Sequence, residues 1–254
     1  MNIKMRRAVI VVLVSVLVAP ATATTIAVLW SPDRIVMASD SLVENFQPED
    51  IEGLKMCKID NHGGFFFAAW GMFHDDEARL DMPHTVRKYF VDSGRIKEKA
   101  NASAAEIRGP LLKAFQYGHK TQSPKLYKKY VASRSAGGFV VAAISNRGPV
   151  IVTVEFLRQD DAKGYPVDMI PHVDLVDNTI SGAKSQYRLL GATTAAQRLV
   201  KTKGFHQYDI TTAARKLIQA EIDDEPDRVG PPIDVVEIDK QGHRWIVPHG
   251  ECSY

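Results

Sequence analysis

Short runs of apolar and β-branched residues, separated by turn-forming residues, recur along the chain and indicate β-strands. The runs come in pairs, which are joined by turn sequences such as Ser31-Pro32-Asp33 and Asn61-His62-Gly63. The predicted strands cover residues 25–30, 34–39, 54–60, 64–69, 139–144, 150–156, 233–238 and 243–247. Pairs of this kind predict antiparallel hairpins.

Four stretches carry apolar residues at helical spacing. They cover 76–95, 102–117, 184–201 and 211–223, and Pro83 and Pro110 are expected to bend or delay the first two helices. Residues 120–135 are expected to form a solvated loop or short helix, and 157–178 an irregular segment. Strand pairs with helices inserted two at a time predict an α+β sandwich of antiparallel sheets. No linker interrupts residues 24–254, so one domain is predicted.

The first 23 residues differ in character from the rest. Lys4, Arg6 and Arg7 precede an apolar run, and Ala21-Thr22-Ala23 places small residues at a peptidase spacing. These features predict a secretory signal peptide over residues 1–23, removed by signal peptidase, and a periplasmic or extracellular protein. The apolar run is shorter than the ~20 residues that span a bilayer. An uncleaved N-terminal anchor is the alternative.

Composition and charge narrow the function classes. The 254 residues are 45% hydrophobic and 24% charged, as in an ordinary globular protein. Removing the three basic residues of the leader from 32 leaves 29 Lys and Arg against 30 Asp and Glu. This balance gives no indication of nucleic-acid binding. Cys57 and Cys252 both lie in the exported part, where one disulfide and two free thiols are both compatible with the sequence.

The sequence has no spacing typical of a metal or phosphate site. It contains neither H-E-x-x-H nor paired C-x-x-C, and His74-Asp75-Asp76 is interpreted as a polar loop leading into a helix cap. Ser181-Gly182-Ala183-Lys184 matches the S-x-x-K of serine β-lactamases, but the companion S-D-N and K-T-G elements are missing. No Gly-rich phosphate loop occurs, so no metal and no cofactor are expected.

Cleavage after Ala23 would give Thr24 a catalytic capability. Thr24 would then carry a free α-amine beside its own hydroxyl. The pKa of an α-amine is about 7.7–8, so a neutral fraction exists at physiological pH and can accept the hydroxyl proton. Cleavage in the alternative frame Ala19-Pro20-Ala21 would leave Thr22 first, and Thr24 would lose this chemistry.

The chain offers a candidate for each group that such a nucleophile needs: a cation, a carboxylate that holds it, and a backbone N–H for the oxyanion. Asp40 ends the second predicted strand, so the first hairpin returns it to the neighbourhood of Thr24. Lys55 begins the third strand, and Gly71 ends the fourth, where an unhindered backbone can approach a substrate. Taken singly, Asp40 is more simply a turn residue and Lys55 a charge at a sheet edge.

Together these residues resemble a known family. The segment TTIAVLWSPDRIVMASDS is similar to the opening of proteasome β subunits and their bacterial relatives, the peptidase subunits of ATP-dependent proteases. These are N-terminal nucleophile (Ntn) hydrolases with a four-layer αββα fold of two antiparallel sheets. The resemblance implies a threonine-type peptidase or amidase that acts through an acyl-enzyme on Thr24. It also implies that Lys55 lowers the proton affinity of the amine, that Asp40 orients Lys55, and that the Gly71 N–H binds the oxyanion.

The resemblance extends to further site residues. Ser181 in ISGAKS and Asp227 in DRVGPPIDVV are similar to the serine and aspartate that support the amine in the family. Strand alternation places Cys57 on the same side as Lys55, a position with which the family lines its substrate pocket. Ala69 and Phe73 are expected in the same wall. The implied substrate is a peptide or another small amide.

The sequence departs from the family pattern in three ways, and alternatives to a hydrolase function therefore remain open. Gly230 stands where the family has a serine, and Pro231-Pro232 replaces two glycines. The leader is a secretory signal, so signal peptidase rather than autolysis would expose Thr24, and no ATPase partner is expected. A homo-oligomer is implied by analogy alone. The alternatives are a non-catalytic binding or assembly subunit on the same fold and an unrelated secreted α+β binding module.

Overall fold

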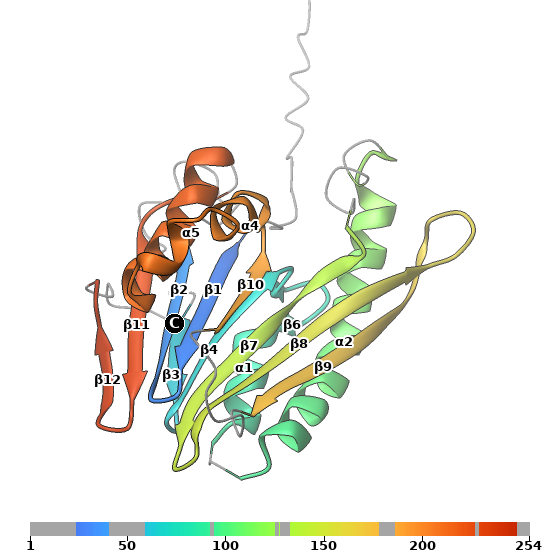
Figure 1. Cartoon of the computed structure of the whole chain (residues 1–254). Coiled ribbons are helices and arrows are strands. Elements are labelled where there is room, and N and C mark those ends of the chain that lie inside the picture. The colour runs from blue at the N-terminus through green and yellow to red at the C-terminus, as the bar shows by residue number, and fades with distance from the viewer. Residues whose placement is uncertain are drawn as a thin grey trace, which may run out of the picture.

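A computed structural model describes residues 24–40, 59–91, 94–124, 127, 133–177, 186–226 and 229–247 (Figure 1). The strands are β1 (Thr25–Ser31), β2 (Arg34–Asp40), β3 (Ile59–His62), β4 (Phe65–Gly71), β5 (His74–Asp75), β6 (Leu80–Asp81), β7 (Ser135–Ser145), β8 (Gly148–Asp160), β9 (Pro166–Asp177), β10 (Gln186–Gly191), β11 (Ile233–Asp239) and β12 (Gly242–Trp245). The helices are α1 (Met82–Tyr89), α2 (Ile96–Thr121), α4 (Thr194–Val200), the 3₁₀ turn η1 (Phe205–Gln207) and α5 (Ile210–Asp224).

Most strands belong to two five-stranded sheets. Sheet A has the order β10-β1-β2-β11-β12, and sheet B has the order β3-β4-β7-β8-β9. Neighbouring strands are antiparallel in both sheets. The prediction of antiparallel sheets is therefore confirmed, and their arrangement with the helices is compatible with an α+β sandwich.

Side-chain alternation along the strands packs the two sheets against each other. Ile26, Val28 and Trp30 of β1 lie in one apolar cluster with Phe66 and Trp70 of β4. The intervening β1 residues face the other side of sheet A, as the period of two in a strand requires. Each central strand is therefore buried on both faces, which explains why β1 and β4 are almost continuously apolar.

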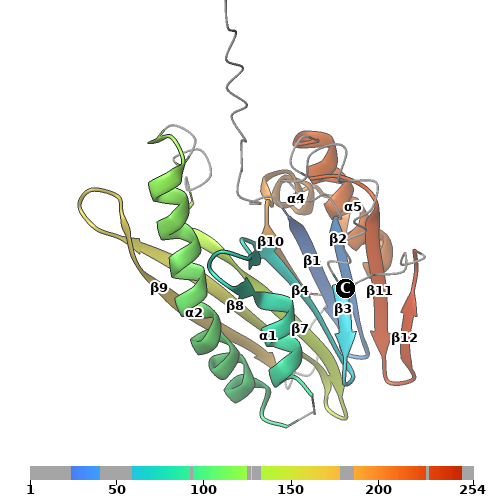
Figure 2. The same ribbon diagram turned by 180° about the vertical axis from the view of Figure 1, so that it is seen from behind.

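Helices cover the outer face of each sheet. The outer side of β4 and β7 packs against α1 and α2, where Ala104, Ile107 and Leu111 repeat at helical spacing on the buried side of α2. The outer side of β1, β2 and β11 packs against α4 and α5 through residues such as Ala196 and Leu217. Figures 1 and 2, seen from opposite sides, show the two helix pairs on opposite sides of the molecule.

The structure corrects the sequence prediction at two segments. Residues predicted as irregular between 157 and 178 form the end of β8 and the whole of β9. Pro166 and Pro171 concealed this strand, and they are tolerated because β9 is the edge strand of sheet B. The predicted helix 184–201 is wrong in its first half, since residues 186–191 form β10 and pair with β1. Gly191 ends β10 in a left-handed conformation (φ +83°) before α4 begins.

The first two helices also start elsewhere than predicted. The predicted helix 76–95 gives way to the short hairpin β5–β6, and α1 begins only after Asp81, whose carboxylate accepts the N–H of His84. The next helix, α2, is longer than predicted and contains Pro110 in its interior. Within the described ranges, no helix is both long and apolar enough to span a membrane.

Candidate functional site

Thr24 lies at the N-terminal end of β1 and is almost completely buried, with 4% of its surface exposed. Its carbonyl oxygen accepts a hydrogen bond from the N–H of Ala192, at 3.1 Å. The next residue, Thr25, pairs with Gly191 of β10 and is fully buried. Thr24 is therefore fixed in the space between the start of β1 and the end of β10.

The carboxylate of Asp40 anchors the start of β1. Asp40 ends β2, is fully buried, and accepts the backbone N–H of Thr25 at 2.7 Å. The β1–β2 hairpin produces this contact, because Ser31 pairs with Arg34 at the turn and Ile26 with Ser39 at the open end. The predicted proximity of Asp40 and Thr24 is therefore present, with Thr25 as the residue that Asp40 binds.

A turn between β10 and α4, residues 191–193, closes over Thr24 and Thr25. We call it the β10–α4 turn. In addition to the Ala192 N–H bond to Thr24, the hydroxyl of Thr25 donates to the carbonyl of Ala192 at 2.7 Å. A Cβ at Gly191 would fall well inside van der Waals contact of the Thr24 carbonyl oxygen. Only glycine permits this close approach at a positive φ.

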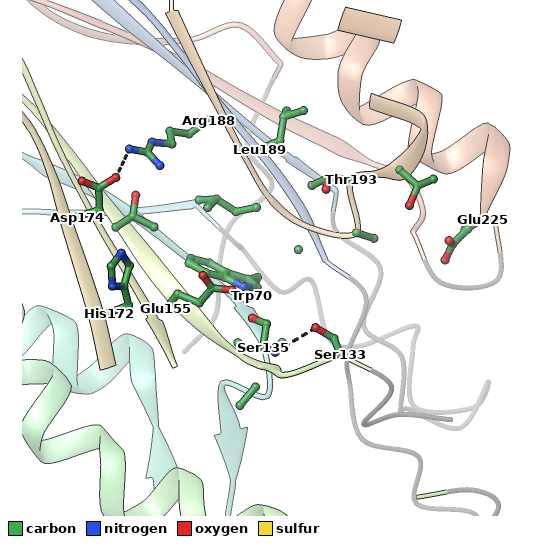
Figure 3. A pocket seen from close by; sticks show the side chains of 18 of the residues that line it. Trp70, Ser133, Ser135, Glu155, His172, Asp174, Arg188, Leu189, Thr193 and Glu225 are labelled. Atoms are coloured by element: carbon green, nitrogen blue, oxygen red, sulfur yellow. Dashed lines mark hydrogen bonds and ion pairs between the residues drawn. The ribbon is translucent and has the colours of Figure 1, made fainter. Parts of the chain in front are cut away.

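A cavity of about 700 Å³ opens beside this turn. We call it the edge cleft. Its walls include Trp70 and Gly71 of β4, Thr153 and Glu155 of β8, His172 and Asp174 of β9, and residues 188–194 of β10 and the following turn (Figure 3). Two wall residues, Gly191 and Ala192, directly contact Thr24. A volume of this size is typical of small-molecule and peptide sites.

The edge cleft exists because sheet B continues past the edge of sheet A. Along the inner face of β8, Ile151 packs between the sheets, whereas Thr153 and Glu155, which follow it on the same face, line the cleft. The same change occurs along β9, where His172 and Asp174 line the cleft. The inner face of sheet B is therefore apolar where sheet A covers it and polar where the cleft begins.

Charged side chains give the edge cleft a polar wall. Arg188 of β10 forms an ion pair with Asp174 of β9, which connects the edge strands of the two sheets. Figure 3 shows this pair across the cleft from Glu225, with Glu155 and His172 on the sheet B side. These groups can hold polar parts of a substrate.

Gly71 is the residue whose backbone N–H is predicted to bind an oxyanion. It ends β4 with φ +72°, lines the edge cleft, and pairs with Gly137 of β7, which has φ +122°. A Cβ on Gly71 would overlap the backbone of Gly137. The two strands approach closely here because both residues are glycine.

The other predicted site residues lie either in the apolar core or outside the described ranges. Ala69 and Phe73 are buried in the apolar cluster between sheet B and the helices α1 and α2. They are not among the residues that wall the edge cleft, so their predicted contact with substrate stays a prediction. Four predicted site residues lie outside the described ranges: Lys55, Cys57, Ser181 and Asp227.

The β10–α4 turn was not predicted from the sequence. Its signal is the sequence Leu189-Leu190-Gly191-Ala192, an apolar strand end followed by small residues and the start of a helix. The predicted helix across this segment hid that pattern. The contact of Ala192 with Thr25 joins residues 167 positions apart, so local sequence could not reveal it.

The acidic loop after β4 has a structural explanation. Asp75 accepts the N–H of Ala78 and so stabilises the turn of the β5–β6 hairpin, and exposed His74 lies 3.2 Å from Asp76. In the part of the chain that the structure describes, no three His, Cys, Asp or Glu side chains are grouped as a metal site would require.

Comparison with known proteins does not assign this chain to a family. No protein-family model matches the sequence, and no curated protein is significantly similar to it.

Proposed function

We propose that the protein is an exported threonine-type amide or peptide hydrolase of the Ntn-hydrolase fold. Thr24, exposed when signal peptidase removes residues 1–23, is the nucleophile. One observation carries this proposal: Thr24 is held at the start of β1, between buried Asp40 and the β10–α4 turn, in direct contact with the wall of the edge cleft.

The chemistry follows from an amine and a hydroxyl on one residue. The neutral α-amine of Thr24 accepts the hydroxyl proton while the oxygen attacks the carbonyl carbon of the substrate. The amide C–N bond then breaks, the amine passes the proton to the leaving nitrogen, and an ester on Thr24 remains. A water molecule, deprotonated by the same amine, cleaves the ester, releases the acid and restores the hydroxyl.

The surroundings of Thr24 support this chemistry. The buried carboxylate of Asp40 holds the Thr25 N–H and would also orient a cation, the role proposed for Lys55. The end of β4 at Gly71 brings backbone to the edge cleft, where a developing oxyanion would sit. Ser181 and Asp227 are proposed to support the amine, on the basis of the family resemblance.

The substrate is proposed to be a peptide or small amide that enters the edge cleft. Because the protein is proposed to be exported, it would act without an ATP-driven unfoldase, on substrates that are already short or unfolded. A homo-oligomer remains an expectation from the family resemblance.

The test is hydrolysis of fluorogenic peptide and amide substrates by the mature protein. We expect turnover to disappear in Thr24→Ala and Lys55→Ala and to persist at a lower rate in Thr24→Ser, which keeps a hydroxyl. The matched control is Thr212→Ala, a partly buried threonine of α5 on the far side of sheet A. Unchanged turnover in Thr24→Ala would contradict the proposal. Binding of peptides without any turnover would favour a non-catalytic binding or assembly subunit on the same fold.

A further inference from the structure

We infer that Glu221 is a positioning residue that holds the β10–α4 turn, and through it Thr24, in the geometry that catalysis needs. This inference rests on the proposed function of Thr24. Glu221 lies on α5, on the far side of sheet A from sheet B, and no motif in the sequence singles it out. It acts through the backbone of α4 and not by contact with substrate.

Glu221 supplies the cap that α4 lacks. The residue before α4, Thr193, makes no side-chain hydrogen bond to the first turn of the helix. One carboxylate oxygen of Glu221 accepts the N–H of Ala196 at 2.7 Å, and the backbone of Ala195 also acts to lower the pKa of that carboxyl. The N–H of Ala196 lies in the first turn and has no partner inside α4, so Glu221 satisfies it from a neighbouring helix. A negative charge also interacts favourably with a helix N-terminus.

The burial of this cap makes it difficult to replace. Glu221 and Ala196 are fully buried, so water does not readily take over this hydrogen bond. The second carboxylate oxygen of Glu221 is buried without a hydrogen-bond partner among the described residues. A fully buried glutamate with one carboxylate oxygen unsatisfied is costly, and the hydrogen bond to Ala196 offsets part of this cost.

The first turn of α4 is continuous with the turn that binds the nucleophile. Only Thr193 and Thr194 separate Ala195 from Ala192. Ala192 donates its N–H to the Thr24 carbonyl at 3.1 Å and accepts the Thr25 hydroxyl at 2.7 Å. A shift of α4 would therefore move both hydrogen bonds that fix the start of β1 from this side.

The experiment compares three variants of the full mature protein. Glu221→Met keeps the length and apolar stem but removes the acceptor, Glu221→Gln keeps one acceptor oxygen, and Asp223→Asn is the control. Asp223 is an exposed carboxylate on the same helix, hydrogen-bonded to Gln219 of that helix. The measurements are kcat and KM for peptide hydrolysis, and the amide hydrogen exchange of residues 191–196.

We expect kcat of Glu221→Met to fall by up to ~100-fold with little change in KM, as for a nucleophile displaced by about 1 Å. Amides of residues 191–196 should exchange at least about tenfold faster in that variant. Glu221→Gln should restore most of both properties, and Asp223→Asn should behave as wild type. A folded Glu221→Met protein with unchanged kcat, or with unchanged exchange at Ala192, would overturn the inference.

The wild-type protein provides a second test if Glu221→Met does not fold. Ala192 and Ala196 should then show the same free energy of opening, calculated from each exchange rate relative to that of the unstructured amide, because they open as one unit. Clearly different values would overturn the inference. The two proposals fail separately. A wild-type protein without any hydrolase activity would refute the proposed function, whereas hydrogen exchange still decides whether Glu221 holds the turn.

Discussion

Thr24 and Thr25 are neighbours in sequence with different structural positions. Thr25 is part of the β1–β10 pairing, gives its N–H to Asp40 and gives its hydroxyl to Ala192. Thr24 precedes the strand and contacts the β10–α4 turn through its carbonyl. Thr25 therefore fixes the backbone at the start of β1, whereas Thr24 is the residue proposed as the nucleophile.

We predict that Asp40→Ala destabilises the fold as well as the site. The substitution leaves the buried N–H of Thr25 without its acceptor, which costs about 1–3 kcal/mol. Equilibrium denaturation of the variant and the wild type measures this loss. The control is Asp33→Ala in the turn of the same hairpin, an exposed aspartate whose replacement should change stability by less than about 0.5 kcal/mol. Equal stability of the two variants would contradict the anchoring function of Asp40.

Glu221 is predicted to make stability depend on pH. Burial raises the pKa of its carboxyl above the ordinary value, and nearby Glu225 and Asp224 act in the same direction, although the bonds from α4 oppose them. The Asp224 carboxylate is itself in an ion pair with Arg198 of α4. A raised pKa means that the folded protein binds the proton more tightly than the unfolded chain. Its contribution to stability is therefore complete below the unfolded value near 4.5 and is lost as the pH rises through the folded value.

The comparison with Glu221→Gln isolates this effect. The glutamine does not titrate. As the pH rises above about 4.5, the unfolding free energy of the wild type should therefore fall relative to that of Glu221→Gln. Urea denaturation at several pH values measures the difference. A difference that is constant over this range would show that the pKa of Glu221 is not raised.

At the scale of elements, the β10–α4 turn depends on one glycine. We predict that Gly191→Ala separates β10 from Thr24, because the added Cβ would overlap the Thr24 carbonyl and because φ is +83°. Turnover should be lost, and stability should fall by about 1–3 kcal/mol. The control is Gly204→Ala, where a Cβ meets nothing within 4 Å. Wild-type activity and stability in Gly191→Ala would contradict this contact.

Elements with a clear local signal could be predicted from sequence, and edge elements could not. The hairpin of β1 and β2 was predicted to within one residue at each end, because two apolar strands surround the turn Ser31-Pro32-Asp33. By contrast, β9 carries two prolines and several aspartates, and only its pairing with β8 explains why it is a strand. The short strand β10 resembles a helix in composition and is fixed by pairing with β1.

The same distinction holds for the candidate site. The proximity of Thr24 and Asp40 could be predicted, because one hairpin produces it. The β10–α4 turn, the edge cleft and Glu221 could not, because each depends on contacts between distant parts of the chain. Glu221, for example, bonds to Ala196 of the preceding helix, and helical spacing alone does not indicate which residue of α5 faces the start of α4.

At the scale of the whole molecule, the packing of two sheets of different extent creates the site. Sheet A ends at β10, whereas sheet B continues through β8 and β9, and the uncovered inner face of sheet B becomes the floor of the edge cleft. The start of β1 lies beside β10 and therefore beside that cleft. This arrangement places the first residue after the predicted leader next to a space that can hold a substrate.

The central claim is that Thr24 is the N-terminal nucleophile. Mass spectrometry of the exported protein, before and after reaction with a β-lactone that acylates hydroxyl nucleophiles, tests it most directly. The account predicts a mature chain that begins at Thr24 and gains one acyl group on that residue. A mature chain that begins at another residue, such as Thr22, or an acyl group on a different residue, would contradict the account.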